Sequence, residues 1–380
     1  MVARARHLYA QANYSTAVEC YTSALEAVRS IPRTTKPKQN FSLFGKKKDN
    51  SKPSSNLESD WDGYLKALGN RSACYMMLGI IHPAMEDCKA VLKEQPDNLK
   101  IRIRLGAGLL KVGSLTQSNE AYKYVVEKAT ALRESSTNTT EKEAALKCEQ
   151  DAKEGIEQVF KLKYAMERAY SAQRRSQHDE AVRQAGLAIA IAPHDHKMYS
   201  VRATALYKFK KWKQCVDECV ECARTVAVAS PRILERLVAT IDKHSNVDSN
   251  ARQVLRADAT SNPIGVITCG RLMTSKMCQL FVPALRYCER CAEAEAILRI
   301  LGEESTEARV WVLGEVKRIE DLRQGKESGD AAFRRGKYHA AVALYSEALG
   351  IDANADRSVF ILVLVYCGAS VTFKYSFPSL

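Results

Sequence analysis

Apolar residues recur at intervals of three and four along most of this chain, which is the spacing of one face of an α-helix. The clearest example is segment 338–349, where Ala341, Leu344, Tyr345 and Ala348 share a face. Gly336 stands just before this segment, and glycine adopts the left-handed conformation that ends a helix at little cost. Only 10 of the 380 residues are proline. The pattern therefore predicts helices joined by short turns.

These helices return with a period of 34 residues. Small residues 34 positions apart are Gly79 and Gly113, Ala84 and Ser118, and Ala181 and Cys215. A random bundle of amphipathic helices would show the helical spacing but not this period. A 34-residue unit with small residues where two helices cross is typical of the tetratricopeptide repeat (TPR), a pair of antiparallel helices A and B. We therefore expect an all-α TPR helix-turn-helix solenoid, a right-handed superhelix of about seven repeats in two or three modules.

Breaks in the period divide the chain into five parts. We expect an N-terminal TPR module at 1–132 with a flexible basic insertion at 31–60, a linker helix at 133–163 and a middle TPR block at 164–325, followed by the start of a third module at 326–355 and an atypical apolar tail at 356–380. The apolar run 359–373 is shorter than the roughly 20 residues that span a bilayer, so a membrane is not the expected partner.

Both ends of the chain interrupt a repeat. Met1 falls inside a predicted helix A, and the repeat pattern fails after Asp352. We expect an unnatural chain end there, from alternative splicing or an error in the gene sequence. The alternative is a tail that folds on a partner or associates with a membrane.

The chain is basic, with 57 Lys and Arg against 44 Asp and Glu, a net charge of +13. This excess is either an ordinary solvated surface or a sign of an acidic peptide, a nucleic acid or an anionic membrane as partner. No motif combining aromatic and basic residues indicates nucleic acid, so we favour the peptide. Twelve cysteines lie scattered in helical segments behind no secretory signal. We expect free thiols in a reducing compartment, the cytoplasm, with the nucleus as a further location.

The cysteines allow one alternative of another class, a thiolate metal site. Cys215, Cys219 and Cys222 have iron–sulfur spacing, and Cys288 with Cys291 would complete a zinc site. Such motifs need a loop, whereas these positions read as small-residue slots of helix B in the fifth and sixth repeats, where cysteine acts as a small apolar residue. His194-Asp195-His196 reads as a solvated turn, and no phosphate-binding glycine loop occurs. We therefore predict no enzyme, no cofactor and no metal.

A candidate peptide site follows from three polar residues on predicted A helices. Lys100 and Arg104 are four residues apart and so share a helix face, and Asn70 in the preceding repeat should lie across from them. Two cations and an amide suit a pair of carboxylates, because arginine binds one bidentately while lysine and asparagine each add a donor. The plainer interpretation is that both cations are solvated.

These residues resemble the clamp TPR domain of chaperone cofactors, in which Asn-Arg-Ser-Ala and a Lys-xxx-Arg pair open the second and third repeats. Here they are 70–73 and Lys100 with Arg104. The resemblance implies binding of the acidic C-terminal tails of heat shock proteins 70 and 90. The family places a further Lys and Asn on the first helix, where this chain has Val2 and Arg6. Arg6 could still meet an acidic tail, which gives a predicted site of Asn70, Lys100, Arg104 and Arg6.

The order of modules across about 1–353 resembles the TPR-containing J-protein co-chaperones, most strongly at 69–79 and 326–352. That family carries a J domain with a His-Pro-Asp loop, and no His-Pro-Asp occurs here. In the last strong repeat Lys326 matches a clamp lysine, but Asp330 stands where the family has asparagine and would repel a carboxylate. We expect a co-chaperone or adaptor whose second clamp is inactive. The alternative function is a general TPR scaffold unrelated to chaperones.

Overall fold

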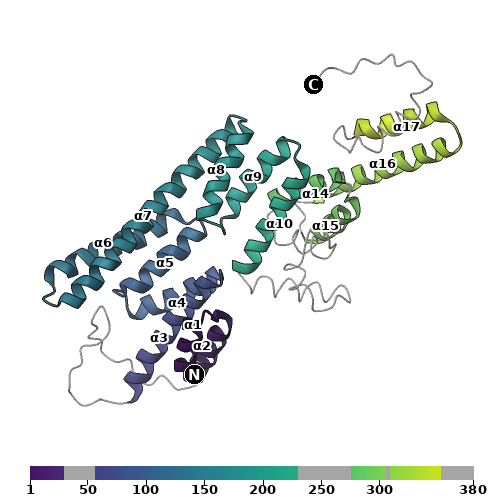
Figure 1. Ribbon diagram of the computed structural model, residues 1–380. Helices are drawn as coiled ribbons and strands as arrows, with labels where there is room; N and C mark the ends of the chain where they lie inside the picture. Colours follow the sequence, from purple (N-terminus) through teal and green to yellow (C-terminus); the bar gives the residue numbers. More distant parts are fainter. Residues whose placement is uncertain (30–55, 230–274, 289, 305–308, 352–380) are drawn as a thin grey trace. The chain divides into compact units, whose positions relative to one another are not determined.

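The structure is a computed structural model, and it describes residues 1–29, 56–229, 275–288, 290–304 and 309–351, which contain only helices and turns (Figure 1). These residues fall into two compact units. The first consists of Met1–Val201 with the segment that begins at Arg224, and the second of Arg202–Ala223 with the later part of the chain. Residues 31–55 of the predicted insertion and the whole predicted tail, 356–380, lie outside the described residues.

The helices of the first unit follow one another in hairpins. They are α1 (Val2–Ala10), α2 (Tyr14–Arg29), α3 (Asn56–Met77), α4 (Ile81–Glu94), α5 (Leu99–Lys111), α6 (Leu115–Ser135), α7 (Thr139–Arg174) and α8 (His178–Ile191). The chain continues into α9 (His196–Lys208) and α10 (Trp212–Ala229). The second unit also contains α14 (Ser275–Tyr287), α15 (Cys291–Glu304), α16 (Arg309–Arg334) and α17 (Tyr338–Ile351). None of these described helices has both the length and the apolar composition needed to cross a membrane.

Within the described ranges, six turns between a helix A and a helix B are built in the same way. One residue in each turn has a positive φ: Ala12, Gly79, Gly113, Ser176, Lys210 and Gly336. The next residue donates its backbone N–H to a carbonyl five positions back, as Ser114 does to Leu109 at 2.9 Å, which closes the end of helix A. Gly79 and Gly113 are 34 residues apart, and so are Ser176 and Lys210. The predicted period and the TPR fold are thereby confirmed.

The predicted small residues lie where the paired helices cross. Ala84, Ser118, Ala181 and Cys215 are all fully buried. Ser118 Oγ donates to the Gly106 carbonyl at 2.8 Å, and Cys215 Sγ donates to the Ala203 carbonyl at 3.5 Å. Each small polar side chain thus satisfies its own donor on the partner helix, which lets the two backbones approach closely.

Helix α7 continues past the predicted boundary at residue 163. It begins after Asn138, whose side chain accepts from the Thr140 N–H at 3.0 Å, and it runs unbroken for 36 residues. No proline interrupts the helix, so no feature of its sequence ends it at 163. Helix α3 likewise begins at Asn56, so the last five residues of the predicted insertion are helical. The division into domains stays a prediction.

The sixth repeat differs from the prediction. Cys288 lies in the turn after α14, and Cys291 is the first residue of α15, so neither occupies a slot inside a helix B. Glycine and proline are both absent from 287–291, and the sequence therefore gave no signal for this turn. The prediction that Cys215, Cys219 and Cys222 occupy positions inside a helix B is correct, because all three are buried in α10.

Candidate peptide-binding site

Arg104 of α5 is fixed against α3. Its Nη1 donates to the Gly69 carbonyl at 2.7 Å and to Ser72 Oγ at 3.1 Å. Ser72 is buried and donates its own hydroxyl to the same carbonyl at 2.7 Å. Among the described residues no protein group accepts from Nε or Nη2 of Arg104, so one edge of the guanidinium is left to bind a carboxylate.

Asn70 follows Gly69 on α3 and faces the first repeat. A side-chain hydrogen bond joins Asn70 to Tyr21 of α2. Burial raises the pKa of Tyr21, while the nearby charge of Arg6 on α1 and the bond from Asn70 act in the opposite direction. The structure therefore brings Arg6 and Asn70 together around one phenol, next to the carbonyl that holds Arg104.

Lys100 is the other predicted cation of α5. It is exposed, and its charge acts on Cys148 of α7, where it opposes the rise that burial causes in the pKa of that thiol. Lys100 and Arg104 lie one helical turn apart on α5, but Arg104 reaches α3 and Lys100 lies toward α7. No ion pair holds Lys100 within the part of the chain that the structure describes.

Two neighbouring residues do not join the site. Val2, at the position where the resembling clamp has lysine, is half-buried against the core of α1 to α4. Arg102 donates to the Pro96 carbonyl at 2.6 Å and lies 3.9 Å over the ring of Tyr124, on another side of α5 as predicted. The candidate site therefore groups Arg6, Asn70 and Arg104, with Lys100 one helical turn away on α5, and it has no counterpart to the first lysine.

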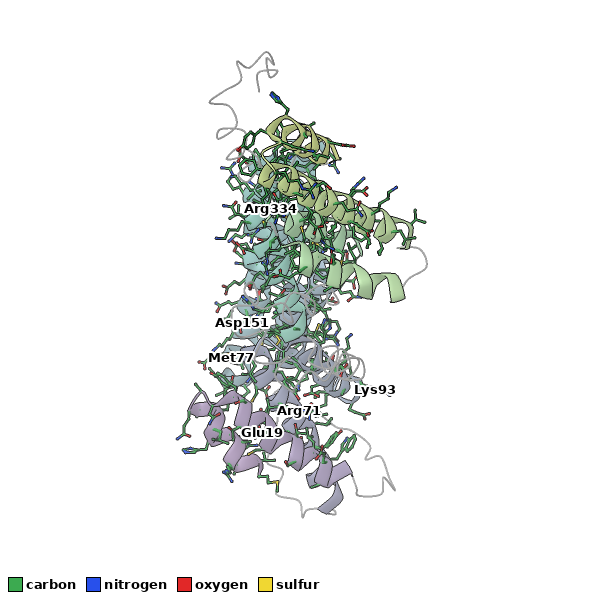
Figure 2. All side chains as sticks on the ribbon, turned by 90° about the vertical axis from the view of Figure 1, so that its right-hand side faces the viewer. Glu19, Arg71, Met77, Lys93, Asp151 and Arg334 are labelled. Carbon is green, nitrogen blue, oxygen red and sulfur yellow. The ribbon has the colours of Figure 1, made fainter. Side chains whose placement is uncertain are left out.

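Sequence reasoning missed the supporting residues. Arg71 donates from Nε and Nη2 to the two oxygens of Asp87 at 2.8 Å each, and from Nη1 to Thr22 at 3.1 Å (Figure 2 labels Arg71). This links α2, α3 and α4. In Asn-Arg-Ser-Ala, the asparagine thus faces the site, the arginine joins three helices, and the serine positions Arg104. Tyr21 belongs to no such motif, so no sequence signal linked it to the site.

The last repeat carries an acid at the corresponding position. Arg6 and Asp330 both stand six residues before the left-handed residue of their turn, Ala12 and Gly336 respectively. The Asp330 carboxylate accepts a hydrogen bond from the hydroxyl of Tyr345 on α17, whereas Lys326 is exposed. An acid held here would oppose a second carboxylate, and the inactivity of this second clamp stays a prediction.

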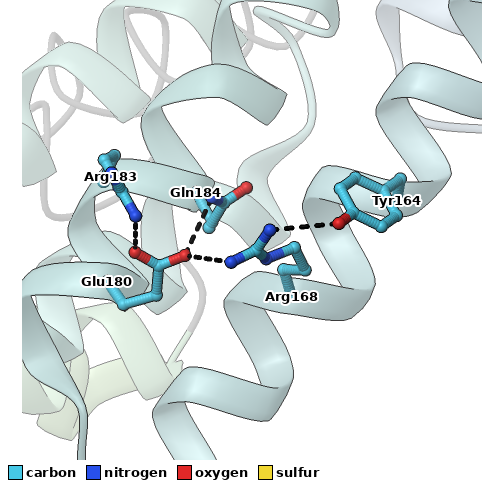
Figure 3. Close-up of polar contacts among 5 residues, drawn as sticks. All are labelled: Tyr164, Arg168, Glu180, Arg183 and Gln184. Atoms are coloured by element: carbon cyan, nitrogen blue, oxygen red, sulfur yellow. Dashed lines mark hydrogen bonds and ion pairs between the residues drawn. The ribbon is translucent and has the colours of Figure 1, made fainter.

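A second polar group joins α7 to α8 (Figure 3). Arg168 donates to Tyr164 and to Glu180, each at 3.0 Å, and Gln184 donates to Glu180 at 2.9 Å. Arg183 also pairs with Glu180, and its hydrogen bond is the main cause that lowers the pKa of this carboxyl. Because exposed pairs of this kind contribute little free energy, we assign the group to holding the hairpin in register. Within the described ranges, no three His, Cys, Asp or Glu side chains are arranged to hold a metal.

His194 and Asp195 are packed rather than solvated, which corrects the prediction of a solvated turn for these two residues, whereas His196 is exposed. The backbone N–H of His194 donates to the Lys111 carbonyl at 3.0 Å, and the ring Nδ1 of His194 lies 3.3 Å from the Thr225 carbonyl. Asp195 is buried against Gly113. Sequence reasoning was wrong here because polar residues after Pro193 are typical of an exposed loop, whereas the turn at Gly113 supplies a backbone on which His194 and Asp195 pack.

This packing predicts a pH dependence of stability. Burial lowers the pKa of His194, and the charges of Lys111 and His82 act in the same direction, so the folded state resists a proton that the unfolded state accepts. The free energy of unfolding should fall as the pH drops below about 6.5, the ordinary histidine pKa. In the His194→Gln variant this decrease in the free energy of unfolding should be smaller. Urea denaturation at pH 7.5 and 5.5 measures this. His339→Gln, at an exposed site on α17, is the control. An identical pH slope for wild type and His194→Gln would contradict the assignment.

Comparisons with known proteins agree with the fold. No family model matches the sequence. Human DnaJ homolog subfamily C member 7 is 30% identical over 159 residues, which cover 38% of this chain and 26% of that protein. The chain is thus aligned with about a quarter of the length of this curated relative. This weak homology supports the resemblance to TPR-containing co-chaperones.

Two solved structures resemble the chain. The crystal structure of the P58(IPK) TPR domain matches with a TM-score of 0.56 at 12% identity, over 96% of this chain and 77% of that one. The TPR2AB domain of yeast Sti1, solved as a pHSP90 complex, has a TM-score of 0.26 at 14% identity, over 84% of this chain and 96% of that one. The first similarity shows the TPR fold.

Proposed function

We propose that the N-terminal repeats bind the acidic C-terminal tail of heat shock protein 70 or 90, and that the chain acts as a cytoplasmic co-chaperone or adaptor rather than as an enzyme. The observation that carries the proposal is Arg104, whose Nη1 is held by the Gly69 carbonyl and Ser72 Oγ, at the residue that precedes Asn70 on α3. The homology to a DnaJ homolog, although it spans only part of that protein, supports a role of this kind.

The chemistry of the site matches the end of such a tail. A C-terminal aspartate carries two carboxylates, which Arg104 and Asn70 would bind with Arg6 nearby. Lys100 would meet an acidic side chain further upstream. Each charge-assisted hydrogen bond contributes about 1.5–3 kcal/mol, and the ordering of a short peptide offsets part of this. An affinity of about 1 μM is expected, equivalent to about −8 kcal/mol.

Fluorescence polarisation with labelled Met-Glu-Glu-Val-Asp tests the proposal. We expect the free-carboxylate peptide to bind and the amidated peptide to bind at least tenfold more weakly. Lys100→Ala should reduce affinity about tenfold, which corresponds to about 1.4 kcal/mol, and Arg104→Ala by more, because it removes a bidentate partner. Arg102→Ala is the matched control, since Arg102 lies on the same helix but on another side.

Equal binding of the free and amidated peptides would exclude a carboxylate clamp. That result would favour the second candidate, a general TPR scaffold that binds an internal segment of its partner. One observation supports this alternative: Val2 supplies no cation where the resembling clamp has one. A scaffold of that kind would bind without preference for a free C-terminus and with little dependence on salt.

A further inference from the structure

Helix α7 carries two exposed aromatic side chains on one face. Phe160 is 58% exposed and Tyr164 is 60% exposed, and the two residues are one helical turn apart. The opposite face of the same stretch is buried through small and apolar residues, namely Ala152, Gly155, Val159, Leu162 and Ala165. Large apolar side chains that lie together on the surface of a rigid helix are typical of a face that another protein covers.

The side chain of Tyr164 is ordered before any partner binds. Arg168 Nη1 donates to the Tyr164 hydroxyl at 3.0 Å, and Cζ of Arg168 lies 5.5 Å from the centroid of the Tyr164 ring (Figure 3). Arg168 is held in turn by Glu180 of α8 at 3.0 Å. Less side-chain entropy is therefore lost when a partner packs on this ring.

The charges around Phe160 follow an order that is complementary to itself. Lys153 and Glu157 stand seven and three positions before Phe160, and Lys163 and Glu167 stand three and seven positions after it. Steps of three, four and seven residues keep all of them on the side of the helix that carries Phe160. The four charged side chains are between 58% and 65% exposed.

We propose that this face of α7 binds the same face of a second copy of the chain, with the two helices antiparallel about a two-fold axis at Phe160. In a contact of this symmetry, a residue that precedes Phe160 meets the residue that follows Phe160 by the same number of positions in the other copy. Lys153 then meets the partner's Glu167, and Glu157 meets the partner's Lys163.

The apolar residues fit the same arrangement. Phe160 packs on the partner's Phe160, and Tyr164 lies opposite the partner's Ile156, which is half-buried. A parallel pair of helices about a two-fold axis would instead set each charge against its own like charge, which is unfavourable. The order of the charges thus selects the antiparallel dimer, and this inference is independent of the peptide site.

The ion pairs that these residues form along α7 do not prevent the exchange. Glu157 pairs with Lys161 at 2.6 Å and Lys163 with Glu167 at 3.9 Å, and all four side chains are more than half exposed. Exposed pairs of this kind contribute about 0–1 kcal/mol, so they are given up at little cost when a partner supplies the opposite charge.

Sedimentation velocity of the full chain between about 1 μM and about 300 μM measures self-association, with a reductant present so that the free cysteines stay reduced. Wild type should change from monomer to dimer as its concentration rises. Phe160→Asp should raise the dissociation constant of the dimer at least about tenfold. Glu154→Lys, at an exposed position on another side of α7, is the control for a charge reversal and should dimerise as wild type does.

Charge reversal at the proposed contacts tests the antiparallel register. Glu157→Lys places two lysines opposite each other, and Lys163→Glu places two glutamates opposite each other, so each variant alone should dimerise at least about tenfold more weakly than wild type. An equimolar mixture of the two variants should recover the dimer. In the mixed dimer the new lysine at position 157 meets the new glutamate at position 163, and the native pair is kept at the other end.

Three results would overturn the proposal. A wild type that stays monomeric over this range would exclude the dimer and leave the face to a helix of another protein. A dimer that Phe160→Asp does not weaken would place the contact elsewhere on the molecule. If the mixture of the two reversed variants associates no better than either variant alone, the antiparallel arrangement about Phe160 is wrong. Matching circular dichroism spectra confirm that all variants are folded.

Discussion

Replacing Asp87 with alanine is expected to lower the free energy of unfolding of the N-terminal repeats by about 3–5 kcal/mol. Asp87 of α4 accepts two hydrogen bonds from Arg71, and its side chain is 8% exposed against 18% for Arg71. Burial acts to lower the pKa of Arg71, but the bonds to Asp87 outweigh it and the pKa is raised. Without Asp87 the largely buried Arg71 guanidinium loses its main counter-charge. The cost of burying this unpaired charge lowers the free energy of unfolding.

Urea denaturation followed by circular dichroism measures this loss. The matched control is Asp62→Ala on α3, because Asp62 and Lys66 form a pair in which both side chains are more than 40% exposed. Exposed pairs contribute about 0–1 kcal/mol, so this variant should be nearly as stable as wild type. Similar losses in Asp87→Ala and Asp62→Ala would show that burial of the Arg71 pair does not govern its contribution.

Replacing Gly155 with alanine is expected to destabilise the protein by about 1–3 kcal/mol, although alanine favours a helix by about 1 kcal/mol. A Cβ at Gly155 of α7 would lie 2.4 Å from Cζ of Tyr122. The ring of Tyr122 is buried, and on its other side Gly106 of α5 leaves only 3.0 Å for a Cβ. Burial raises the pKa of the Tyr122 phenol to about 12. Both glycines lie close to this ring, so a Cβ at Gly155 would force the ring or α7 to shift.

Gly63→Ala on α3 provides a control with the opposite sign. No atom lies within 4 Å of a Cβ built at Gly63, so the alanine should raise stability by about 0.5–1 kcal/mol through helix propensity alone. Thermal denaturation of both variants compares the two effects directly. Gly155→Ala melting at or above the wild-type temperature would mean that α7 can move away from Tyr122 without loss.

Much of the fold could be predicted from the sequence, because each repeat must meet the same local demand. The turn needs a left-handed residue, and the crossing needs a small one, so Gly113 and Ser118 recur at a fixed distance from Gly79 and Ala84. The sixth repeat was misplaced because the turn at Cys288 contains neither glycine nor proline. Helix α7 extended further than predicted because a helix without a breaking residue continues wherever packing supports it.

The site could be predicted only in part. Helical spacing correctly separated Arg102 from Arg104, since side chains two residues apart point to different sides. Helical spacing could not show that Arg104 reaches α3 while Lys100 lies toward α7. Both side chains are long, so the contacts that they make depend on the neighbouring helices. The roles of Ser72 and Tyr21 depend on contacts across 32 and 49 positions in the chain, respectively, and no local pattern encodes such contacts.

The unbroken course of α7 has a mechanical consequence. At about 1.5 Å per residue, its 36 residues form a rod roughly 54 Å long. The Lys147 end lies beside α5 and α6, and the Arg168 end packs against α8. A straight helix bends little over this length, so a small tilt at one end is transmitted to the other as a lever arm would transmit it. A tilt at the end beside α5 and α6 would therefore reach α8 without passing a break in the helix.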